Sequence, residues 1–504
     1  MHNSKQHIPS NTAAGGITTG SAATDSAAAG RPADSAPLAY SNTLTSQGTP
    51  RLIVPDFARG MALWGIAAAN ATTAWFHNTE ATTAAMFGGI SDSHPMLDKI
   101  VAVFTAMFAH NRGLPMFSTL LGVGVGFIAM SLWRKQFPVG AARKTLVRRY
   151  AFLLLFGAVH TVFLFYGDIM TTYGICGILL ALLLTMKDKH IKLIAYIMLG
   201  LSLVVSVLAA ALIGFAAGEN PAFAEEMSGS MNPAAALDTL PGGANLDSYP
   251  GLLATQAMVL VFTLLGMPFT TFVYFPVMLI GFVWAREGRF AKVAEYRKSF
   301  WAWTVAGAVF VFGIGLPWGL ASIGVLPSQW EAVFTILNFG AGVITGPAIL
   351  AFCALLLDSA QQRINRATAT SATPAQAYVA ATPLWLRIPA ALGKRSMSGY
   401  LFQSLAFFVL VYPFTLNFGY NTGAAVQFGL ATAIWLISLA LSWALEVSNK
   451  PGPFEWLHRR ISYGKTGRPQ LKQARQGQPQ AQGQAQGQPR ARQGVPQTQG
   501  QPQA

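Results

Sequence analysis

Residues 148–173, RRYAFLLLFGAVHTVFLFYGDIMTTY, decide the fold of this chain. Two arginines lead into a long apolar run that contains one histidine, His160, and ends at Gly167 and Asp168. A membrane-spanning helix needs about 20 mostly apolar residues, and Lys and Arg stay on the cytoplasmic side. The stretch therefore predicts a transmembrane helix that enters the membrane from the cytoplasm.

The composition of the whole chain is that of a membrane protein. Of the 504 residues, 52% are hydrophobic and 11% are charged, whereas a soluble chain carries about 25% charged residues. The net charge is +15, but the basic residues lie in short clusters between apolar runs and in the C-terminal tail, as orientation signals do. We therefore expect no nucleic-acid partner. The two cysteines, Cys176 and Cys353, lie in apolar runs and offer neither a disulfide framework nor a metal site.

Apolar segments predict an all-α bundle of about ten transmembrane helices. The loops at 133–149, 187–192, 286–298 and 358–395 carry Lys or Arg, whereas the loop at 217–251 carries acidic residues and no basic one. By the alternation of these loops, we expect both termini in the cytoplasm of a multi-pass plasma-membrane protein. The predicted spans are residues 57–76, 114–132, 150–166, 169–186, 191–216, 256–284, 300–321, 332–357, 398–417 and 424–445.

Four regions follow from this pattern. Residues 1–50 are rich in Ala, Ser, Thr and Gly, and residues 467–504 repeat Gln, Pro, Gly and Arg, so we expect both tails to be disordered. No basic segment followed by an apolar core begins the chain, so no cleavable signal peptide is expected. Between the tails we expect an N-terminal membrane half at 51–250 and a C-terminal membrane module at 251–466. That module ends in a basic amphipathic segment, expected to lie on the anionic inner leaflet.

The sequence does not determine where two segments lie relative to the membrane. Residues 97–110 hold an apolar run that is too short to cross the bilayer, and residues 251–268 belong to a segment longer than one span. Each either re-enters the membrane or lies at its surface.

Gly122, Gly124 and Gly126, in the sequence LLGVGVGF, have the spacing of a nucleotide-binding loop. No strand flanks them and they lie within an apolar span, so they predict close helix packing instead. The sequence contains no nucleophile elbow, P-loop or H-E-x-x-H zinc motif.

Polar residues inside the spans are candidates for chemistry, because a charge at the bilayer centre costs a few kcal/mol. Asn70 and His160 each lie eleven residues beyond the arginine that begins their span, which places them about 16 Å deep. Gln403 lies eight residues beyond its arginine, about 12 Å deep. If these helices are neighbours, the three residues line one cavity that reaches towards Asp168. Otherwise each makes an interhelical hydrogen bond that holds the bundle together.

Charged residues at the ends of spans have two interpretations. Asp56 and Arg59 either form a surface ion pair, worth roughly 0.2–0.5 kcal/mol, or bind a charged headgroup or the phosphates of a cytoplasmic ligand. Asp168 either caps the following helix or belongs to a site. His110 and Arg112 are either an acid–base and anion-binding pair at the outer face or part of a solvated loop.

Several motifs occur in order along the chain, at 56–60 (DFARG), 116–118 (MFS), 167–169 (GDI), 393–404 (GKRSMSGYLFQS) and 452–457 (GPFEWL). They resemble the YeiB-like integral membrane family, whose C-terminal module is called domain of unknown function 418. The likeness covers about 51–466.

This family is similar in architecture to the membrane acyltransferases, including the lysosomal enzyme that acetylates heparan glucosamine. The resemblance implies that a cytoplasmic acyl donor, an acyl-CoA co-substrate, binds near Asp56 and Arg59. It also implies a histidine that acts as a base or relay. The histidine of the acetylating enzyme precedes its second span, a position that His110 matches loosely and His160 does not match. From the polar residues themselves, the catalytic candidates are His160, His110 and Asp168.

The sequence leaves three functions open. The first is an acyltransferase that passes an acyl group to a hydroxyl or amine of a small molecule or envelope glycan. The second is a transporter or flippase of a small amphipathic metabolite, with a proton relay in the membrane, although no inverted repeat is visible. The third is a scaffold without catalysis, and a homo-oligomer is compatible with each. We expect no metal and no covalently bound cofactor. The residues expected to line the site are Asn70, Ser118, Tyr173, Tyr400 and Gln403.

Overall fold

In the computed structural model of the chain, all the regular elements that are described are helices. The described residues are 51–76, 83–220, 223, 237, 239–327, 329–371, 373–419 and 421–470. The tails predicted to be disordered therefore lie outside the described residues, except for 467–470, and so does part of the acidic loop, at 221–222, 224–236 and 238. Internal contacts divide the chain after Pro469, and the description below concerns the part before this point.

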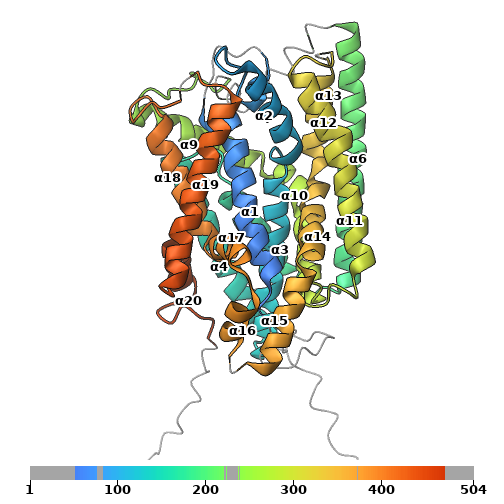
Figure 1. Cartoon of the computed structure of the whole chain (residues 1–504), viewed down its shortest axis with the longest axis vertical. Helices are drawn as coiled ribbons and strands as arrows, with labels where there is room; N and C mark the ends of the chain where they lie inside the picture. Colours follow the sequence, from blue (N-terminus) through green and yellow to red (C-terminus); the bar gives the residue numbers. More distant parts are fainter. Residues whose placement is uncertain are drawn as a thin grey trace, which may run out of the picture. The chain divides into compact units, whose positions relative to one another are not determined.

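The helical elements follow one another along the chain and are labelled in Figure 1. They are α1 (Ile53–Asn70), η2 (Ala71–Trp75), η3 (Ala85–Phe87), α2 (Pro95–Phe108), α3 (Gly113–Arg134), α4 (Val139–Phe163), α5 (Met170–Leu182), α6 (Asp188–Glu219), α9 (Tyr249–Leu265), α10 (Met267–Arg286), α11 (Arg297–Phe310), η4 (Val311–Gly315), α12 (Leu316–Ser322), α13 (Gln329–Gly340), η5 (Gly342–Ile344), α14 (Thr345–Leu356), α15 (Asp358–Thr370), α16 (Pro374–Ala381), α17 (Leu384–Lys394), α18 (Ser396–Val411), α19 (Ala424–Val447) and α20 (Pro453–Tyr463).

The length and apolar character of these helices are those of a multi-pass membrane protein. Six helical segments of the described chain are long and apolar enough to cross a membrane, and seven are if the bent pair α13 and α14, at 49°, forms one span. Helices α5, α9 and α18 are apolar but shorter. Each of the ten predicted segments is helical over most of its length. The number of ten spans and the cytoplasmic side of the termini stay predictions.

Proline changes two of the predicted boundaries. The expected span at 256–284 divides at Gly266 into α9 and α10, because Pro268 stands in the first turn of α10, where its missing N–H costs nothing. Helix α18 ends at Val411 instead of 417, because Tyr412 precedes Pro413 and takes an extended conformation.

The short apolar run at 97–110, whose position the sequence left open, forms most of α2, which packs against α12 and α19.

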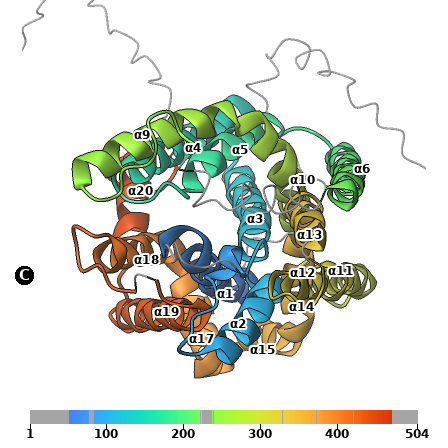
Figure 2. The same cartoon turned by 90° about the horizontal axis from the view of Figure 1, so that it is seen from above.

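Helices α1 and α3 lie inside the ring formed by the other helices (Figure 2), and small residues allow this close packing. A Cβ atom at Gly122 would lie 1.9 Å from the carbonyl oxygen of Met278 in α10, and one at Gly126 would lie 2.6 Å from Ala285. These two glycines therefore serve helix packing, as predicted. Gly124 lies on another face of α3, where a Cβ atom would lie 3.3 Å from the Arg59 side chain.

Two further glycines bring functional segments together. A Cβ atom at Gly393 of α17 would lie 1.7 Å from the carbonyl oxygen of Asp56, so α17 and α1 cross at backbone contact. A Cβ atom at Gly157 of α4 would lie 2.2 Å from the amide of Thr171 in α5. The α4–α5 crossing places His160, one turn further along α4, beside the start of α5.

Candidate active site

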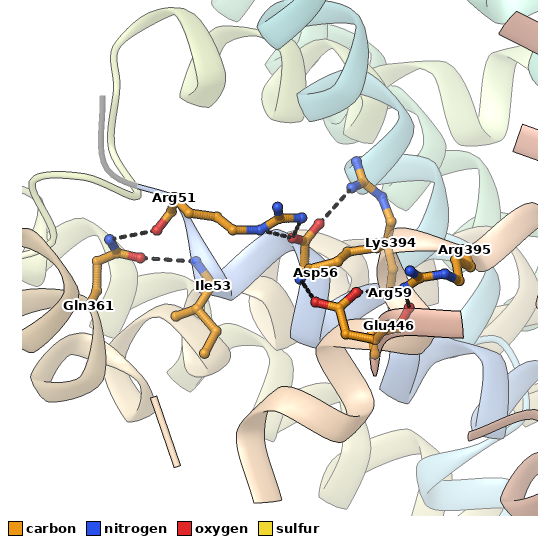
Figure 3. Close-up of polar contacts among 9 residues, drawn as sticks. Arg51, Ile53, Asp56, Arg59, Gln361, Lys394, Arg395 and Glu446 are labelled. Carbon is orange, nitrogen blue, oxygen red and sulfur yellow. Dashed lines mark hydrogen bonds and ion pairs between the residues drawn. The ribbon is translucent and has the colours of Figure 1, made fainter. Parts of the chain in front are cut away.

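The first turn of α1 is held by Gln361 of α15. The Ile53 amide donates a hydrogen bond to Gln361 Oε1 at 3.0 Å, and Gln361 Nε2 donates to the Arg51 carbonyl at 3.2 Å (Figure 3). The Arg51 guanidinium then donates two hydrogen bonds to Asp56 Oδ2, at 2.9 and 3.2 Å. Asp56 Oδ1 also lies 3.7 Å from Arg59 Nη1. The predicted Asp56–Arg59 pair therefore exists, but Asp56 is shared with a second arginine.

A second ionic cluster lies next to the first in Figure 3. Glu446 of α19 accepts hydrogen bonds from both Lys394 and Arg395. The Arg395 guanidinium also donates to the Lys450 carbonyl at 2.6 and 3.1 Å. Burial lowers the pKa of Lys394 below its ordinary value, the nearby Arg51 charge lowers it further, and Glu446 opposes both. Positive charge thus accumulates around the start of α1.

Part of this charge borders a cavity of about 310 Å³, which we call the basic cavity. Its lining comes from α1, α3, α4, α5, the α17–α18 turn and α20. Cations outnumber carboxylates in this lining, so the cavity suits a polyanionic group such as a chain of phosphates. The lining cations are Arg51, Arg59, Arg149, Lys394 and Arg459, and the lining carboxylates are Asp56 and Glu455.

Helix α20 closes one side of the basic cavity through two polar contacts. Glu455 Oε1 accepts hydrogen bonds from the amides of Met397 and Ser398, at 2.8 and 3.2 Å, and so caps the start of α18. His458 Nε2 donates to the Arg149 carbonyl at 3.0 Å. Burial, followed by the Arg149 charge, lowers the pKa of His458 to about 4. His458 is therefore neutral near pH 7 and acts as a hydrogen-bond donor.

His160 and Asp168 form a buried pair towards the far end of α1. His160 Nδ1 lies 2.9 Å from Asp168 Oδ1, and the two side chains are 2% and 0% exposed. Asp168 Oδ2 accepts from the amide and hydroxyl of Thr171, at 2.9 and 3.0 Å. The same carboxylate thus caps α5 and orients the imidazole. We call the pair the dyad. His160 Nε2 is buried and has no hydrogen-bond partner among the described residues.

Asp168 borders a second cavity of about 300 Å³, which we call the polar cavity. The described lining contains no Lys or Arg, and Asp168 is its one carboxylate. Tyr400 also borders this cavity, and the centroid of its ring lies 5.2 Å from the centroid of the His160 ring. Hydroxyl and amide groups without a free charge suit a neutral, hydroxylated ligand. The polar lining residues are Asn70, Thr73, His110, Asn111, Tyr166, Asp168, Thr172, Thr263, Thr270, Tyr274 and Tyr400.

A thin partition separates the two cavities. Phe117 and Tyr173 border the basic cavity, whereas Leu114 and Thr172, from the same two helices, border the polar cavity. The Tyr173 hydroxyl lies 3.1 Å from Ser118 Oγ and 3.2 Å from the Leu114 carbonyl oxygen. The rings of Phe117 and Tyr173 stack at 6.0 Å with 2° between their planes. We call these five residues the partition, which is about one side chain thick.

The predicted site residues are distributed over the two cavities. Gln403 and His160 border neither of them. The Gln403 amide donates to Ser438 of α19 at 3.2 Å, whereas His160 contacts Asp168 and Tyr400, which border the polar cavity. Asn70, His160 and Gln403 therefore do not line one cavity together. Asp56, Arg59 and Tyr173 border the basic cavity, Ser118 lies in the partition, and Asn70, His110, Asp168 and Tyr400 border the polar cavity.

His110 and Arg112 are buried, so they do not belong to a solvated loop. Their exposed fractions are 3% and 1%. Thr72 Oγ1 lies 3.2 Å from His110 Nε2, and Arg112 donates to Asn338 Oδ1 at 2.7 Å. His110 packs against the rings of Phe87 and Trp318, and Arg112 reaches Asn338 of α13. These partners are distant in sequence, so spacing alone did not reveal the burial.

Sequence reasoning missed several residues of the basic cavity. Arg149 and Lys394 were interpreted as orientation signals at the ends of spans, and Arg459 as part of a surface segment. Lys394 and Glu455 fall within the motifs GKRSMSGYLFQS and GPFEWL. Their place in these motifs was the available signal, because a charged residue within a family motif at a span end suggests a site more strongly than scattered basic residues do.

Comparison with known proteins identifies relatives of unknown activity. Residues 284–465 match the model of a family described as "Protein of unknown function (DUF418)". The chain is also similar to "Uncharacterized protein YxaH" of Bacillus subtilis (strain 168), with 23% identity over 427 residues, which are 84% of this chain and 96% of that protein. No solved structure matches the chain. The family match includes α17, α18 and α20 around the basic cavity, whereas the dyad lies outside the matched residues.

Proposed function

We propose that this member of the DUF418, or YeiB-like, family is a membrane acyltransferase. In this proposal it moves an acyl group from a coenzyme A thioester to a hydroxyl or amine of an envelope glycan or another small acceptor. The observation that carries the proposal is the dyad, in which a carboxylate holds a buried imidazole through Nδ1 and leaves Nε2 without a described partner. A general base is arranged in this way. His110 and His458 also have one ring nitrogen without a described partner, but only the His160 ring is held by a carboxylate among the described residues.

The basic cavity is the proposed donor site. Coenzyme A carries phosphate groups, which arginine binds with two parallel hydrogen bonds. Arg59 and Arg149 border the cavity, and the two carboxylates in its lining already have other partners, since Asp56 binds Arg51 and Glu455 caps α18. The basic loops at the same ends of the helices support a cytoplasmic donor.

The polar cavity is the proposed acceptor site, and the reaction needs no further reagent. The acceptor oxygen or nitrogen attacks the thioester carbonyl while its proton moves to His160 Nε2. The new C–O or C–N bond forms, the C–S bond breaks, and the proton passes from Nε2 to the departing thiolate. Asp168 keeps the imidazole oriented and stabilises its charged form. The thioester reaches the dyad past the partition, which is about one side chain thick.

Binding and slow hydrolysis of acyl-CoA by the detergent-purified protein test this proposal. We expect His160→Ala to bind acetyl-CoA or longer acyl-CoAs normally and to lose hydrolysis, and Arg59→Ala to weaken binding by about 10–100-fold. Matched controls are His190→Ala and Arg363→Ala, which change exposed residues of α6 and α15. Absence of acyl-CoA binding by a folded, stable sample would contradict the proposal.

The partition also supports a second candidate, proton-coupled transport of a small amphipathic metabolite. Two cavities separated by a thin barrier are what alternating access requires, and the dyad would then be the proton relay. Proton-driven uptake into vesicles that requires His160, by a protein that binds no acyl-CoA, would favour transport. Uptake that survives His160→Ala would exclude this relay.

A further inference from the structure

A third cavity lies at the edge of the bundle, away from the basic and polar cavities. It is a crevice of about 510 Å³ between α6, α11 and the junction of α13 with α14. Helix α6 packs against α10 and α13, and α11 packs against α14. Helices α6, α11 and α13 lie at the right of Figure 2. Small residues widen the crevice, and they include Gly200, Ser202, Ala302 and Ala306.

The crevice has the length of one lipid leaflet. Its lining on α11 runs from Ser299 to Phe310, eleven helical steps or about 16 Å. Its lining on α6 runs from Tyr196 to Leu203, about 10 Å. Half of the hydrocarbon core of a bilayer is about 15 Å thick. Apart from Tyr196 and two serines, the side chains of the lining are apolar, so the crevice matches a fatty acyl chain that lies parallel to the helices.

One end of the crevice carries positive charge. Lys192 lies one turn before Tyr196 on α6, and both Lys192 and Arg289 bind Glu287, each at 2.6 Å. Arg289 also donates a hydrogen bond at 3.0 Å to Ser299 Oγ, which borders the crevice. Two cations share one carboxylate, so this group has a net charge of +1. Lys192 is 33% exposed and can reach a further anion.

We propose that the crevice binds an anionic phospholipid, with one acyl chain between α6 and α11 and the phosphate at Lys192 and Arg289. Basic pockets between membrane helices bind anionic headgroups, and aromatic residues such as Tyr196 and Trp303 lie at headgroup level. A zwitterionic lipid adds a positive group that the two cations repel, and inorganic phosphate lacks the chain that fills the crevice. The site is separate from both cavities above, so it does not depend on the acyltransferase proposal.

Gly200 provides a sharp test, because a Cβ atom there meets nothing within 4 Å while the residue borders the crevice. Leucine at this position favours the helix and fills the crevice. Delipidated, detergent-purified full-length protein is titrated with phosphatidylglycerol or phosphatidylcholine, and bound lipid is measured by native mass spectrometry and thermal unfolding. We expect wild type to prefer phosphatidylglycerol by about tenfold and Gly200→Leu to lose this binding. Gly218→Leu is the matched control, since Gly218 lies on α6 in equally open space outside the crevice lining.

A charge variant separates the headgroup contact from the chain contact. Lys192→Gln should keep lipid binding while the preference for phosphatidylglycerol over phosphatidylcholine falls about fivefold. Equal binding of the two lipids by wild type, or unchanged binding by Gly200→Leu, would overturn the proposal. Equal stabilisation by inorganic phosphate alone would also overturn it. A dimer that Gly200→Leu dissociates would assign the crevice to a second copy of the chain instead.

Discussion

The basic cavity and the polar cavity lie towards opposite ends of α1 and are built in different ways. The basic cavity collects many charges at helix ends, where some remain in contact with water, and Arg51 is 44% exposed. The dyad beside the polar cavity is nearly free of solvent contact, and one hydrogen bond of 2.9 Å joins its two members. The basic cavity gathers its charges at helix ends, whereas the two groups proposed for chemistry lie where solvent is excluded.

This difference has a consequence for mutagenesis. Binding at the basic cavity is shared among several cations, so the loss of one weakens binding without abolishing it. The dyad consists of one imidazole held by one carboxylate, so a change in either group should strongly reduce the rate of acyl transfer. The predictions below use this contrast.

Asp168→Asn should have the largest effect. The amide nitrogen cannot accept the His160 Nδ1 proton, so the imidazole adopts the other tautomer and Nε2 no longer accepts a proton. We expect acyl transfer to fall by about 10²–10⁴-fold in single-turnover measurements, with donor affinity unchanged. Asp247→Asn, an exposed position, is the control. Unchanged turnover, or a loss confined to donor affinity, would contradict the role given to the dyad.

Lowering the pH should loosen α20 from the basic cavity. The pKa of His458 is about 4 in the folded protein and 6.5 ordinarily, so the unfolded chain binds the proton first as pH falls. His458 therefore contributes stability above pH 6.5 and loses it between pH 6.5 and about 4, at most roughly 3 kcal/mol.

The variant His458→Gln keeps an N–H donor for the Arg149 carbonyl and does not titrate. Thermal unfolding over this pH range should therefore show a smaller loss of stability in the variant than in wild type. His190→Gln, which changes an exposed histidine, should behave like wild type. Parallel curves for wild type and His458→Gln would show that α20 is not held in this way.

Arg59→Gln should weaken donor binding about 10–100-fold, the value of a hydrogen bond to a charged group. Turnover at saturating donor should change little, and high salt should reduce the difference from wild type. Titration calorimetry with acyl-CoA at two salt concentrations measures this, with Arg363→Gln as the control. A lower turnover at saturation with normal affinity would place Arg59 in the chemistry instead of in binding.

Tyr173→Phe should have the smallest effect, because it removes one hydroxyl that holds the partition closed, worth about 1 kcal/mol. Cys176 and Cys353 are both buried, which allows labelling of an added cysteine at Thr172 in a background with both replaced by alanine. A charged thiol reagent applied from the side of the basic cavity should label this cysteine about fivefold faster in the Tyr173→Phe variant.

Tyr166→Phe is the control for this experiment. The Tyr166 hydroxyl donates to the Ala74 carbonyl at 3.0 Å and borders the polar cavity without touching the partition. Equal labelling rates in the Tyr173 and Tyr166 variants would mean that the Tyr173 hydroxyl does not control passage between the cavities.

Features that depend on composition and on spacing within one helix could be predicted from the residues alone. Apolar runs of sufficient length predict membrane helices, residues three apart predict the Asp56–Arg59 pair, and glycines within an apolar run predict close packing. The cap that Asp168 places on α5 is also local, because the accepting carboxylate and the Thr171 amide that donates to it are three residues apart.

Only the tertiary structure decided which helices are neighbours and therefore which residues meet. Gln403 turns towards α19, and Arg149 and Lys394 reach one cavity from segments more than 240 residues apart. Periodicity determines which face of a helix is polar, but not which partner that face meets. That choice depends on backbone contacts such as Gly393 against Asp56 and Gly157 against Thr171, which form only when the whole bundle packs.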